Sequence, residues 1–459
     1  MRLASVLSVC LLTACLPTPG AEVSMNFAQG DLGVSFPPPS AMNGHGLKPG
    51  ERPRRGNAEL ARDFLDLSFR MESGRPLPRF SRFEGPVTVR MTGAVPPSAA
   101  TDLSRLLQRL RSEAGIDIRE IPQGEAAITL QFLPRKVIQT TYANVACFVA
   151  PRVSGWEEFK AARNTGQLDW PSLHRREKLA VFLPADSSAQ EVRDCLHEEL
   201  AQALGPLNDL YRLTDSVFND DNFHTSLTGF DMLILRATYA PELRSGMTEA
   251  EVAARLPLVL ARINPAGGRA AGAAPHSPTP RAWINAIEGA LSGSGPAGRR
   301  ADLAQQALGM ARAQGWTDGR LAFSYFAVGR QLLGSDPAKA MSAFAEAGRV
   351  YRGLPGGAIH AAHVDMQIAA VALASGDSGG ALAIADRITP VVAASENAAL
   401  MATVLMLRAE ALTLQGRDSE AQALRMDSQG WARYGFGSDA QVRARMAEIA
   451  ALARRGKRS

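Results

Sequence analysis

The sequence predicts an α+β domain followed by an all-α domain of helical repeats. Between residues 57 and 265, segments with helical spacing alternate with short runs typical of strands, the pattern of a sheet covered by helices. From residue 281 to residue 459 the chain is rich in Ala and has helical spacing throughout. Residues 266–280 separate the two regions. They are mostly Gly, Ala, Pro and Ser, which predicts a flexible linker.

The N-terminus has the pattern of a secretory signal that ends in a lipid-modified cysteine. Arg2 gives a positive start, and residues 3–12 form an apolar run too short to span a membrane. Leu12-Thr13-Ala14-Cys15 resembles the bacterial lipobox. We therefore expect residues 1–15 to be the lipoprotein signal peptide and lipobox, with lipid on Cys15 anchoring the chain in the membrane, facing the periplasm. An ordinary secretory signal, cut after a small residue, is the alternative.

The residues after the lipobox suggest where the anchor lies. Leu16, and not Asp, follows Cys15, which favours the outer membrane under the enterobacterial sorting rule. Residues 16–56 are rich in Pro, Gly and small residues, so we expect a tether between the anchor and the first domain.

Charge and motifs exclude several functional classes. The net charge of the 459-residue chain is only +5, and its Arg residues are spread along the sequence without a nucleic-acid-binding motif. It has no phosphate-binding loop, dinucleotide fingerprint or G-x-S-x-G. We expect no nucleic-acid partner and no cofactor.

The first domain reads as a small twisted mixed sheet with helices packed on it. Helical spacing predicts helices over residues 57–70, capped by Asn57, and 98–114. A third helix, over residues 247–263, starts at a Thr248–Glu251 capping box. Strands are expected over these ranges, the fourth at an edge and the last in the centre: 87–91, 116–121, 127–132, 142–150 and 178–183. The polar segment 151–176 predicts a long loop.

The central stretch of the chain is a helix with an inward-pointing carboxylate. Ser187 and Gln190 form a capping-box pattern at its start. Glu199 points into its apolar face, which we expect to consist of Val192, Cys195, Leu196, Leu200, Ala203 and Leu204. A carboxylate in such a place is costly unless it is paired or functional. The alternative is a Glu that hydrogen-bonds backbone groups at a turn.

The stretch from Asp194 to Tyr239 resembles the active-site half of a metzincin zinc peptidase, whose motif is H-E-x-x-H-x-x-G-x-x-H followed by a Met-turn. A start at His197 fails because Ala201 would stand at a ligand position. The downstream Ser216-Val217-Phe218 and Leu227-Thr228, with Asp231, fix a start one residue later. In that alignment the motif positions are Glu198, Glu199, Gln202, Gly205 and Asn208, and Phe218 replaces the Met of the turn.

The resemblance keeps the framework and changes all three zinc ligands. Glu198, Gln202 and Asn208 stand where the family has His, and an oxygen set with two neutral amides is a poor zinc site. We therefore expect no metal. A substitute site built from Glu198, Glu199 and His224 is the alternative. Glu199 stands at the position of the catalytic Glu, so it is the candidate general base if the protein is active.

The same stretch, with HEELAQALGPLNDLYRLTDSVFNDDNFHT and LTGFDMLILRATY, also resembles a family of bacterial lipoproteins known as domain of unknown function 2927. That resemblance covers residues 57–265 and brings no established activity.

Besides the lipidated Cys15, two cysteines remain after signal removal, Cys147 and Cys195. In the metzincin-like layout the edge strand passes near the start of the active-site helix, so the resemblance implies a Cys147–Cys195 disulfide in the oxidising periplasm. The alternative is a free Cys195 thiol, with its pKa lowered at the start of the helix, acting as a nucleophile.

The C-terminal region shows a weak repeat of about forty residues. Segments 335–340, 376–381 and 416–421 sit at equivalent helix–turn–helix points. This resembles tetratricopeptide repeats, although their Trp and Tyr signature positions are mostly absent, and another helical solenoid remains open. Such arrays present a concave surface to a protein or peptide. A domain that only adds stability is the alternative.

These observations predict a lipid-anchored binding or assembly factor of the cell envelope. We expect it to bind a protein or peptide partner through its helical repeats and its cleft. An envelope hydrolase or peptidase that uses Glu199 as general base is the first alternative. A structural envelope lipoprotein with a vestigial cleft is the second.

Overall fold

The computed structural model describes residues 55–143, 145–269, 277–292 and 294–456. Within these residues the chain forms two compact units. The α+β unit contains the described residues up to Asp220 and from His224 to residue 269. The helical unit contains the described residues from Ser277 onward together with the remote tripeptide Asp221–Phe223. The signal peptide, Cys15 and nearly all of the expected tether lie outside the described residues.

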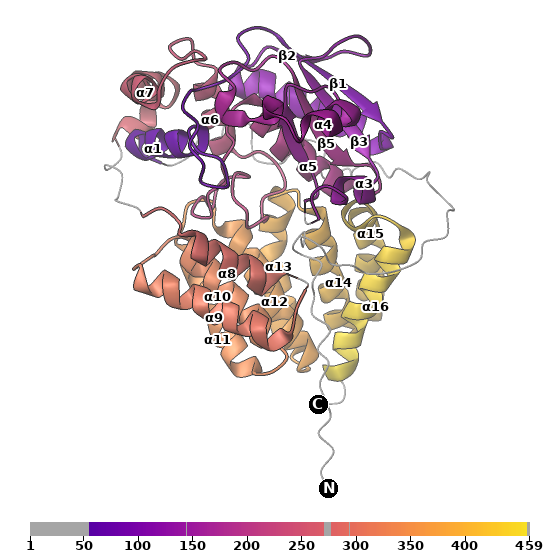
Figure 1. Cartoon of the computed structure of the whole chain (residues 1–459). Coiled ribbons are helices and arrows are strands. Elements are labelled where there is room, and N and C mark those ends of the chain that lie inside the picture. Colours follow the sequence, from indigo (N-terminus) through magenta and orange to yellow (C-terminus); the bar gives the residue numbers. More distant parts are fainter. Residues whose placement is uncertain (1–54, 144, 270–276, 293, 457–459) are drawn as a thin grey trace. The chain divides into compact units, whose positions relative to one another are not determined.

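The α+β unit is built on one mixed sheet of five strands (Figure 1). The strands are β1 (Val87–Gly93), β2 (Ile118–Glu120), β3 (Ile128–Leu133), β4 (Phe148–Pro151) and β5 (Leu179–Pro184). They lie in the order β2-β1-β3-β5-β4. All neighbours are parallel except β4, which runs antiparallel to β5 at the edge. The predicted mixed sheet and its edge strand are confirmed, although the edge strand begins only at Phe148.

Both faces of the sheet are covered, as the burial of β5 shows. All six of its residues are buried, as expected for a strand with helices on both sides. Val181 and its odd-numbered neighbours join the main core with helices α2 (Pro97–Arg109) and α5 (Ala189–Leu204). Ala180 and Phe182 point the other way and join a second cluster with Trp156 and Phe159.

That second cluster corrects one prediction. The segment 151–176, expected to be a loop, contains helix α4 (Trp156–Ala162) and two short 3-10 turns, Gly166–Leu168 and Trp170–Ser172. Trp156 and Phe159 stack at 5.1 Å between ring centroids and pack against Phe182. The seven-residue helix carries too few apolar residues for its spacing to stand out against the polar sequence around it.

Among the other helices of this unit, those over residues 57–68, 97–109 and 249–263 agree with the predicted ranges, whereas the short helix over residues 135–139 was not predicted. These other helices are α1 (Asn57–Ser68), α2 (Pro97–Arg109, extended by a π-type turn to Ala114), the short α3 (Arg135–Gln139), α5 (Ala189–Leu204), α6 (Gly229–Thr238) and α7 (Glu249–Ile263). The Thr248–Glu251 capping box of α7 is confirmed. Two predicted caps are wrong by one residue. Gly56 caps α1 in place of Asn57, and Ser188 caps α5 by accepting from the backbone N–H of Glu191.

The helical unit consists of consecutive helices that pack against their neighbours. They are α8 (Arg281–Leu291), α9 (Ala297–Ala313), α10 (Gly319–Leu332), α11 (Pro337–Arg352), α12 (Ala358–Ala374), α13 (Ser378–Ala394), α14 (Ala398–Leu414), α15 (Asp418–Phe436) and α16 (Asp439–Gly456). The expectation of a helical C-terminal region is confirmed. None of the helices in the described ranges is long and apolar enough to cross a bilayer.

The three predicted helix–turn–helix points fall between α10 and α11, α12 and α13, and α14 and α15. Gly376 and Gly416 turn the chain there with positive φ angles of 84° and 74°, a conformation that favours Gly. The small residues that follow, Ala340, Ala381 and Ala421, are buried almost completely. Their size lets the paired helices approach closely.

Candidate functional site

Helix α5 carries the candidate site on a buried scaffold. The six residues of its expected apolar face are all buried: Val192, Cys195, Leu196, Leu200, Ala203 and Leu204. The helix ends at Gly205, where a Cβ atom would lie 2.9 Å from Cγ2 of Thr238 in α6. The close approach of these two elements therefore requires the Gly at this motif position.

The motif residues of α5 are turned into the protein. Glu199 is only 5% exposed and Gln202 also 5%, while Glu198 is half-buried. Oε2 of Glu199 has no hydrogen-bond partner among the described residues. A buried carboxyl oxygen left in this state is costly, so the site departs from what packing alone would select.

The two amides of the motif are held in hydrogen bonds. Gln202 donates from Nε2 to Oδ2 of Asp209 at 3.3 Å. Asn208 is 8% exposed and donates from Nδ2 to the carbonyl oxygen of Asp66 at 2.9 Å. Both amide nitrogens are therefore directed at acceptors of the protein.

The structure does not bring together the substitute metal site of Glu198, Glu199 and His224. Nε2 of His224 donates to the carbonyl oxygen of Thr214 at 3.0 Å. Across the described ranges, no group of three His, Cys, Asp or Glu side chains has a spacing that could hold a metal ion.

Instead, five acidic residues share one region, which we name the carboxyl cluster: Glu72, Glu198, Glu199, Asp209 and Asp220. Burial, together with the charges of Asp220 and Glu72, raises the pKa of Glu198 to about 8. Burial and the charges of Glu198 and Glu72 raise the pKa of Glu199 well above its usual range. Burial and Glu72 do the same for Asp209. Glu198, Glu199 and Asp209 therefore all hold their protons to a higher pH than ordinary carboxyl groups do.

His197 is not part of this cluster. It is 6% exposed, and its Nδ1 accepts a hydrogen bond from the backbone N–H of Leu227 at 3.1 Å. Burial and the charges of Arg109 and Arg193 lower the pKa of His197 well below its usual range. The neutral ring thus ties α5 to the segment that leads into α6.

The turn below the site is anchored by Asp231. Its carboxylate accepts from Oγ of Ser216 at 2.5 Å and from the backbone N–H of Val217 at 3.2 Å. It also completes a capping box with Thr228 at the start of α6. Phe218, the residue at the Met position of the turn, is fully buried in the main core. These bonds fix the turn independently of any metal.

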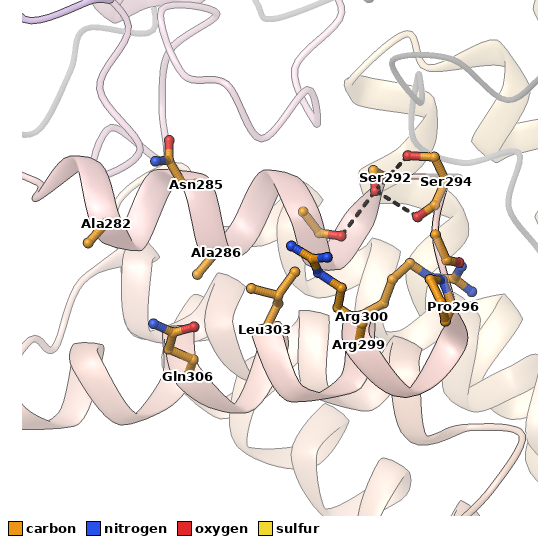
Figure 2. A pocket seen from close by; sticks show the side chains of 12 residues that line it. Ala282, Asn285, Ala286, Ser292, Ser294, Pro296, Arg299, Arg300, Leu303 and Gln306 are labelled. Carbon is orange, nitrogen blue, oxygen red and sulfur yellow. Dashed lines mark hydrogen bonds between the residues drawn. The ribbon is translucent and has the colours of Figure 1, made fainter.

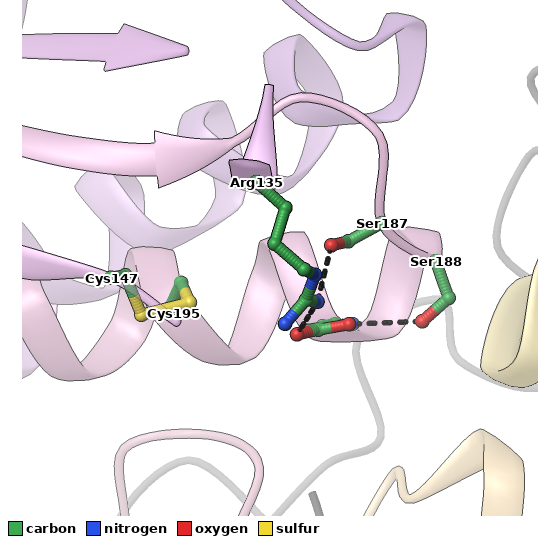
Figure 3. The surroundings of a disulfide bond; sticks show 6 residues. Arg135, Cys147, Ser187, Ser188 and Cys195 are labelled. Carbon is green, nitrogen blue, oxygen red and sulfur yellow. Dashed lines mark hydrogen bonds and ion pairs between the residues drawn. A yellow bond between two sulfur atoms is a disulfide. The ribbon is translucent and has the colours of Figure 1, made fainter. Parts of the chain in front are cut away.

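A disulfide between Cys147 and Cys195 links the chain just before β4 to α5, as predicted (Figure 3). The two Cα atoms are 6.0 Å apart and 48 residues apart in sequence. Cys195 is therefore not a free nucleophile. In the same view, Arg135 donates to Oγ of Ser187 at 2.6 Å and also pairs with Glu191, which holds the first turn of α5.

The edge strand β4 presents backbone groups on its outer side. Arg152 donates its backbone N–H to the carbonyl oxygen of Lys178 at 2.8 Å, so the backbone N–H and C=O groups of the even-numbered residues of β4 point towards β5. In an antiparallel pair these groups point in opposite directions on alternate residues, so the backbone groups of Val149 point away from β5. None of the described residues hydrogen-bonds to the N–H of Val149. The N–H of Leu179, the partner of Pro151 in β5, confirms this alternation, because it donates away from β4 to the carbonyl oxygen of Ala127 at 2.9 Å.

One residue of this region was not foreseen from the sequence. Arg176, 2% exposed, donates from Nη1 to the carbonyl oxygen of Gln202 and from Nη2 to that of Gly205, both at 2.5 Å. It thereby supplies donors to two carbonyl groups at the end of α5, where the helical hydrogen bonds run out. Burial lowers its pKa to about 10. Nothing in the polar sequence around Arg176 distinguishes it from the exposed Arg residues nearby.

The helical unit has a shallow groove of about 590 Å³ between α8 and α9 (Figure 2). Arg299 and Arg300 line it near the start of α9, and Ser292 donates to the carbonyl oxygen of Ser294 on its rim. Arg299 is exposed, and Arg300 already donates to the carbonyl oxygen of Gly295 at 2.6 Å and to Oε1 of Gln331 at 3.3 Å, so nothing in the lining singles out a ligand.

Comparisons with known proteins relate only the first part of the chain to a family. Neither a search of curated proteins nor a search of solved structures gave a match. Residues 57–258 match the model of a family described as "Protein of unknown function (DUF2927)".

Proposed function

We propose that this chain is a lipid-anchored periplasmic binding or assembly factor, whose α+β unit binds an extended peptide without cutting it. In this proposal, lipid on Cys15 anchors the chain in the outer membrane, and the rest of the chain faces the periplasm. The helices from Arg281 onward act as a tetratricopeptide-like array for a protein partner.

A zincin-like origin of the α+β unit is supported by several independent features. The sheet has one antiparallel strand at its edge, beside the helix that carries the motif positions. The helix ends at Gly205, and Ser216–Phe218 forms a pinned turn under the site. In the peptidases that the sequence resembles, these parts are the upper rim, the zinc helix and the Met-turn.

The absence of peptidase activity in this proposal rests on the chemistry of the side chains. A metal-assisted hydrolysis needs ligands for the metal and a base that can accept a proton from water. Gln202 and Asn208 are amides that donate to protein acceptors. Burial and the charges of Glu198 and Glu72 raise the pKa of Glu199 well above its usual range, which favours its protonated form, and a protonated carboxyl cannot take a proton from water.

The observation that carries the peptide-binding role is the outward-facing Val149 on the edge of the sheet. A free strand edge binds an extended peptide through backbone hydrogen bonds, which need no metal. Sheet edges left open in this way attract other strands unless they are blocked. Pro151, the next outward-facing residue, offers no N–H, so Val149 provides the single backbone donor of this edge within β4.

Replacing Val149 with Pro tests this role. The N–H of Val149 is not used in the ladder with β5, so the variant should fold. Pro151 already occupies an equivalent outward-facing position on the same edge. On an array of immobilised decapeptides, Val149→Pro should bind about five to ten times more weakly than the unmodified chain, the effect of one net hydrogen bond.

Val149→Ala is the matched control, because it keeps the N–H and should retain binding. Thermal melts establish that both variants are folded. The proposal is wrong if the unmodified chain binds no decapeptide, or if folded Val149→Pro binds the same peptides with equal affinity.

A further inference from the structure

The tripeptide Asp221–Phe223 belongs to the helical unit, although the described residues on either side of it, up to Asp220 and from His224 to residue 269, belong to the other unit. Phe223 is fully buried, surrounded by rings from α10, α11 and α12. Asp221 is 3% exposed. A short segment from elsewhere in the sequence is thus seated in the helical unit as a bound peptide would be.

Five aromatic rings enclose the Phe223 side chain. The centroid distances are 4.5 Å to His363, 4.8 Å to His360, 5.6 Å to Phe326, 5.9 Å to Phe323 and 6.3 Å to Tyr351. Four of these contacts are edge-to-face, the arrangement that aromatic pairs favour. This cage, which we name the Phe223 pocket, selects for an aromatic side chain.

A polar contact next to the pocket selects for an acid two residues earlier. Oδ2 of Asp221 lies 2.8 Å from Nε2 of His360. Oδ1 of Asp221 accepts from the backbone N–H of Phe223 at 3.2 Å, which closes a tight turn of the kind that Asp favours. Asn222 supports this turn with a positive φ of 57°, which Asn tolerates better than most residues. The turn places both side chains on the helical unit.

The internal segment does not satisfy the pocket completely. Oη of Tyr351 is buried and has no hydrogen-bond partner among the described residues. A segment that also supplied an acceptor there would bind more tightly than Asp221–Phe223 does, because an unpaired buried donor is costly.

We propose that the Phe223 pocket is a recognition site for Asp-x-Phe peptide segments, and that Asp221–Phe223 occupies it until a partner protein's Asp-x-Phe segment displaces it. The internal segment is tethered, so its effective concentration is high, on the order of millimolar for a short connection. It therefore weakens the apparent affinity for a partner, because only the molecules whose pocket is empty can bind the partner's segment. This inference concerns the helical unit and does not depend on peptide binding at β4.

The test uses the full chain and a fluorescent heptapeptide with the sequence of residues 219–225, NDDNFHT. Anisotropy should show weak binding to the unmodified chain. Phe223→Ala, which empties the pocket, should bind the peptide at least about ten times more tightly, because the internal competitor is gone. Peptides in which Ala replaces the Phe, or the Asp two residues before it, should lose most of this gain.

Phe64→Leu, which shortens a fully buried Phe of α1, is the control for general destabilisation and should not gain affinity. If Phe223→Ala does not fold, Phe223→Leu gives the same comparison with a smaller gain. Hydrogen exchange on the unmodified chain adds a readout that needs no variant. An excess of NDDNFHT should accelerate exchange in residues 219–225, whereas the peptide lacking Phe should not.

Folded variants that bind NDDNFHT no better than the unmodified chain would overturn the proposal. So would binding that is unaffected when the peptide loses its Phe, or unchanged exchange at millimolar peptide. In those cases Asp221–Phe223 is simply part of the core of the helical unit.

Discussion

Gln202 donates a hydrogen bond to Asp209 across the start of the turn that follows α5. Gln202 stands at a position where the peptidases that the sequence resembles have a zinc-binding His. Its amide nitrogen is directed at a carboxyl group, and the neighbouring Glu199 keeps an unpaired oxygen in the protein interior. The site therefore contains buried carboxyl groups whose pKa values are raised, in place of zinc-binding His side chains.

The carboxyl cluster should make stability depend on pH in a specific window. The pKa of Glu198 is about 8 in the folded chain, against a usual value of 4.5. Between these values the folded state binds more protons than the unfolded state, so the free energy of unfolding falls as pH rises. Glu199 should show the same dependence through its raised pKa. Glu199→Gln keeps the shape and removes the titration, so it should be more stable than the unmodified chain at pH 8, by on the order of 1–3 kcal/mol, and similar at pH 5.

Urea unfolding at pH 5, 6.5 and 8 measures this difference. Glu125→Gln, a change of the same kind at an exposed position, serves as the control and should leave the pH dependence intact. A Glu199→Gln variant that is less stable at pH 8, or that keeps the full slope, would contradict the account.

The Cys147–Cys195 disulfide should contribute substantially to the α+β unit. It closes a loop with a sequence separation of 48 residues, for which the chain-entropy treatment gives about 4 kcal/mol. The double variant Cys147→Ala and Cys195→Ala should therefore unfold at clearly lower urea concentration. Alkylation of denatured, non-reduced protein should find neither thiol free. Two free thiols in protein purified from the periplasm would refute the bond.

Gly205 should tolerate no side chain. A Cβ atom there would lie 2.9 Å from Cγ2 of Thr238, so Gly205→Ala has to push α5 and α6 apart and should lose about 1–3 kcal/mol of stability. Gly85, whose Cβ position meets no atom within 4 Å, provides the matched control, and Gly85→Ala should be close to neutral. Equal melting temperatures for the two variants would show that the contact is not tight.

Cys15 should carry the membrane anchor. The proposed anchor is attached to its thiol, so Cys15→Ser should abolish labelling by radioactive palmitate and leave an uncleaved precursor. Fractionation of membranes gives the same answer by a second route. Continued palmitate uptake by the variant would rule out lipidation at this residue.

Much of the α+β unit could be predicted because its elements carry local signals. Alternation of apolar residues marked the strands, and the apolar face of α5 placed Glu199 inside the protein, as observed. The Thr248–Glu251 box marked the start of α7. Where two residues could act, tertiary contacts decided. Ser187 is bound by Arg135, which leaves Ser188 to cap α5.

Other features have no signature in a single sequence. Arg176 has its structural role only because the end of α5 lies beside it. Asp209 joins the carboxyl cluster beside Glu72, although the motif points to its neighbour Asn208. The seating of Phe223 among rings more than a hundred residues away depends on tertiary structure alone. In each case, contacts between distant segments give the residue its role.

The central claim is that the α+β unit does not cut peptides. The most direct test incubates the purified chain with a diverse peptide library, with zinc supplied, and identifies products by mass spectrometry beside Glu199→Gln. The account predicts the same product pattern for both proteins as for buffer alone. Cleavage by the unmodified chain that disappears in Glu199→Gln would contradict it and establish a Glu199-dependent hydrolase.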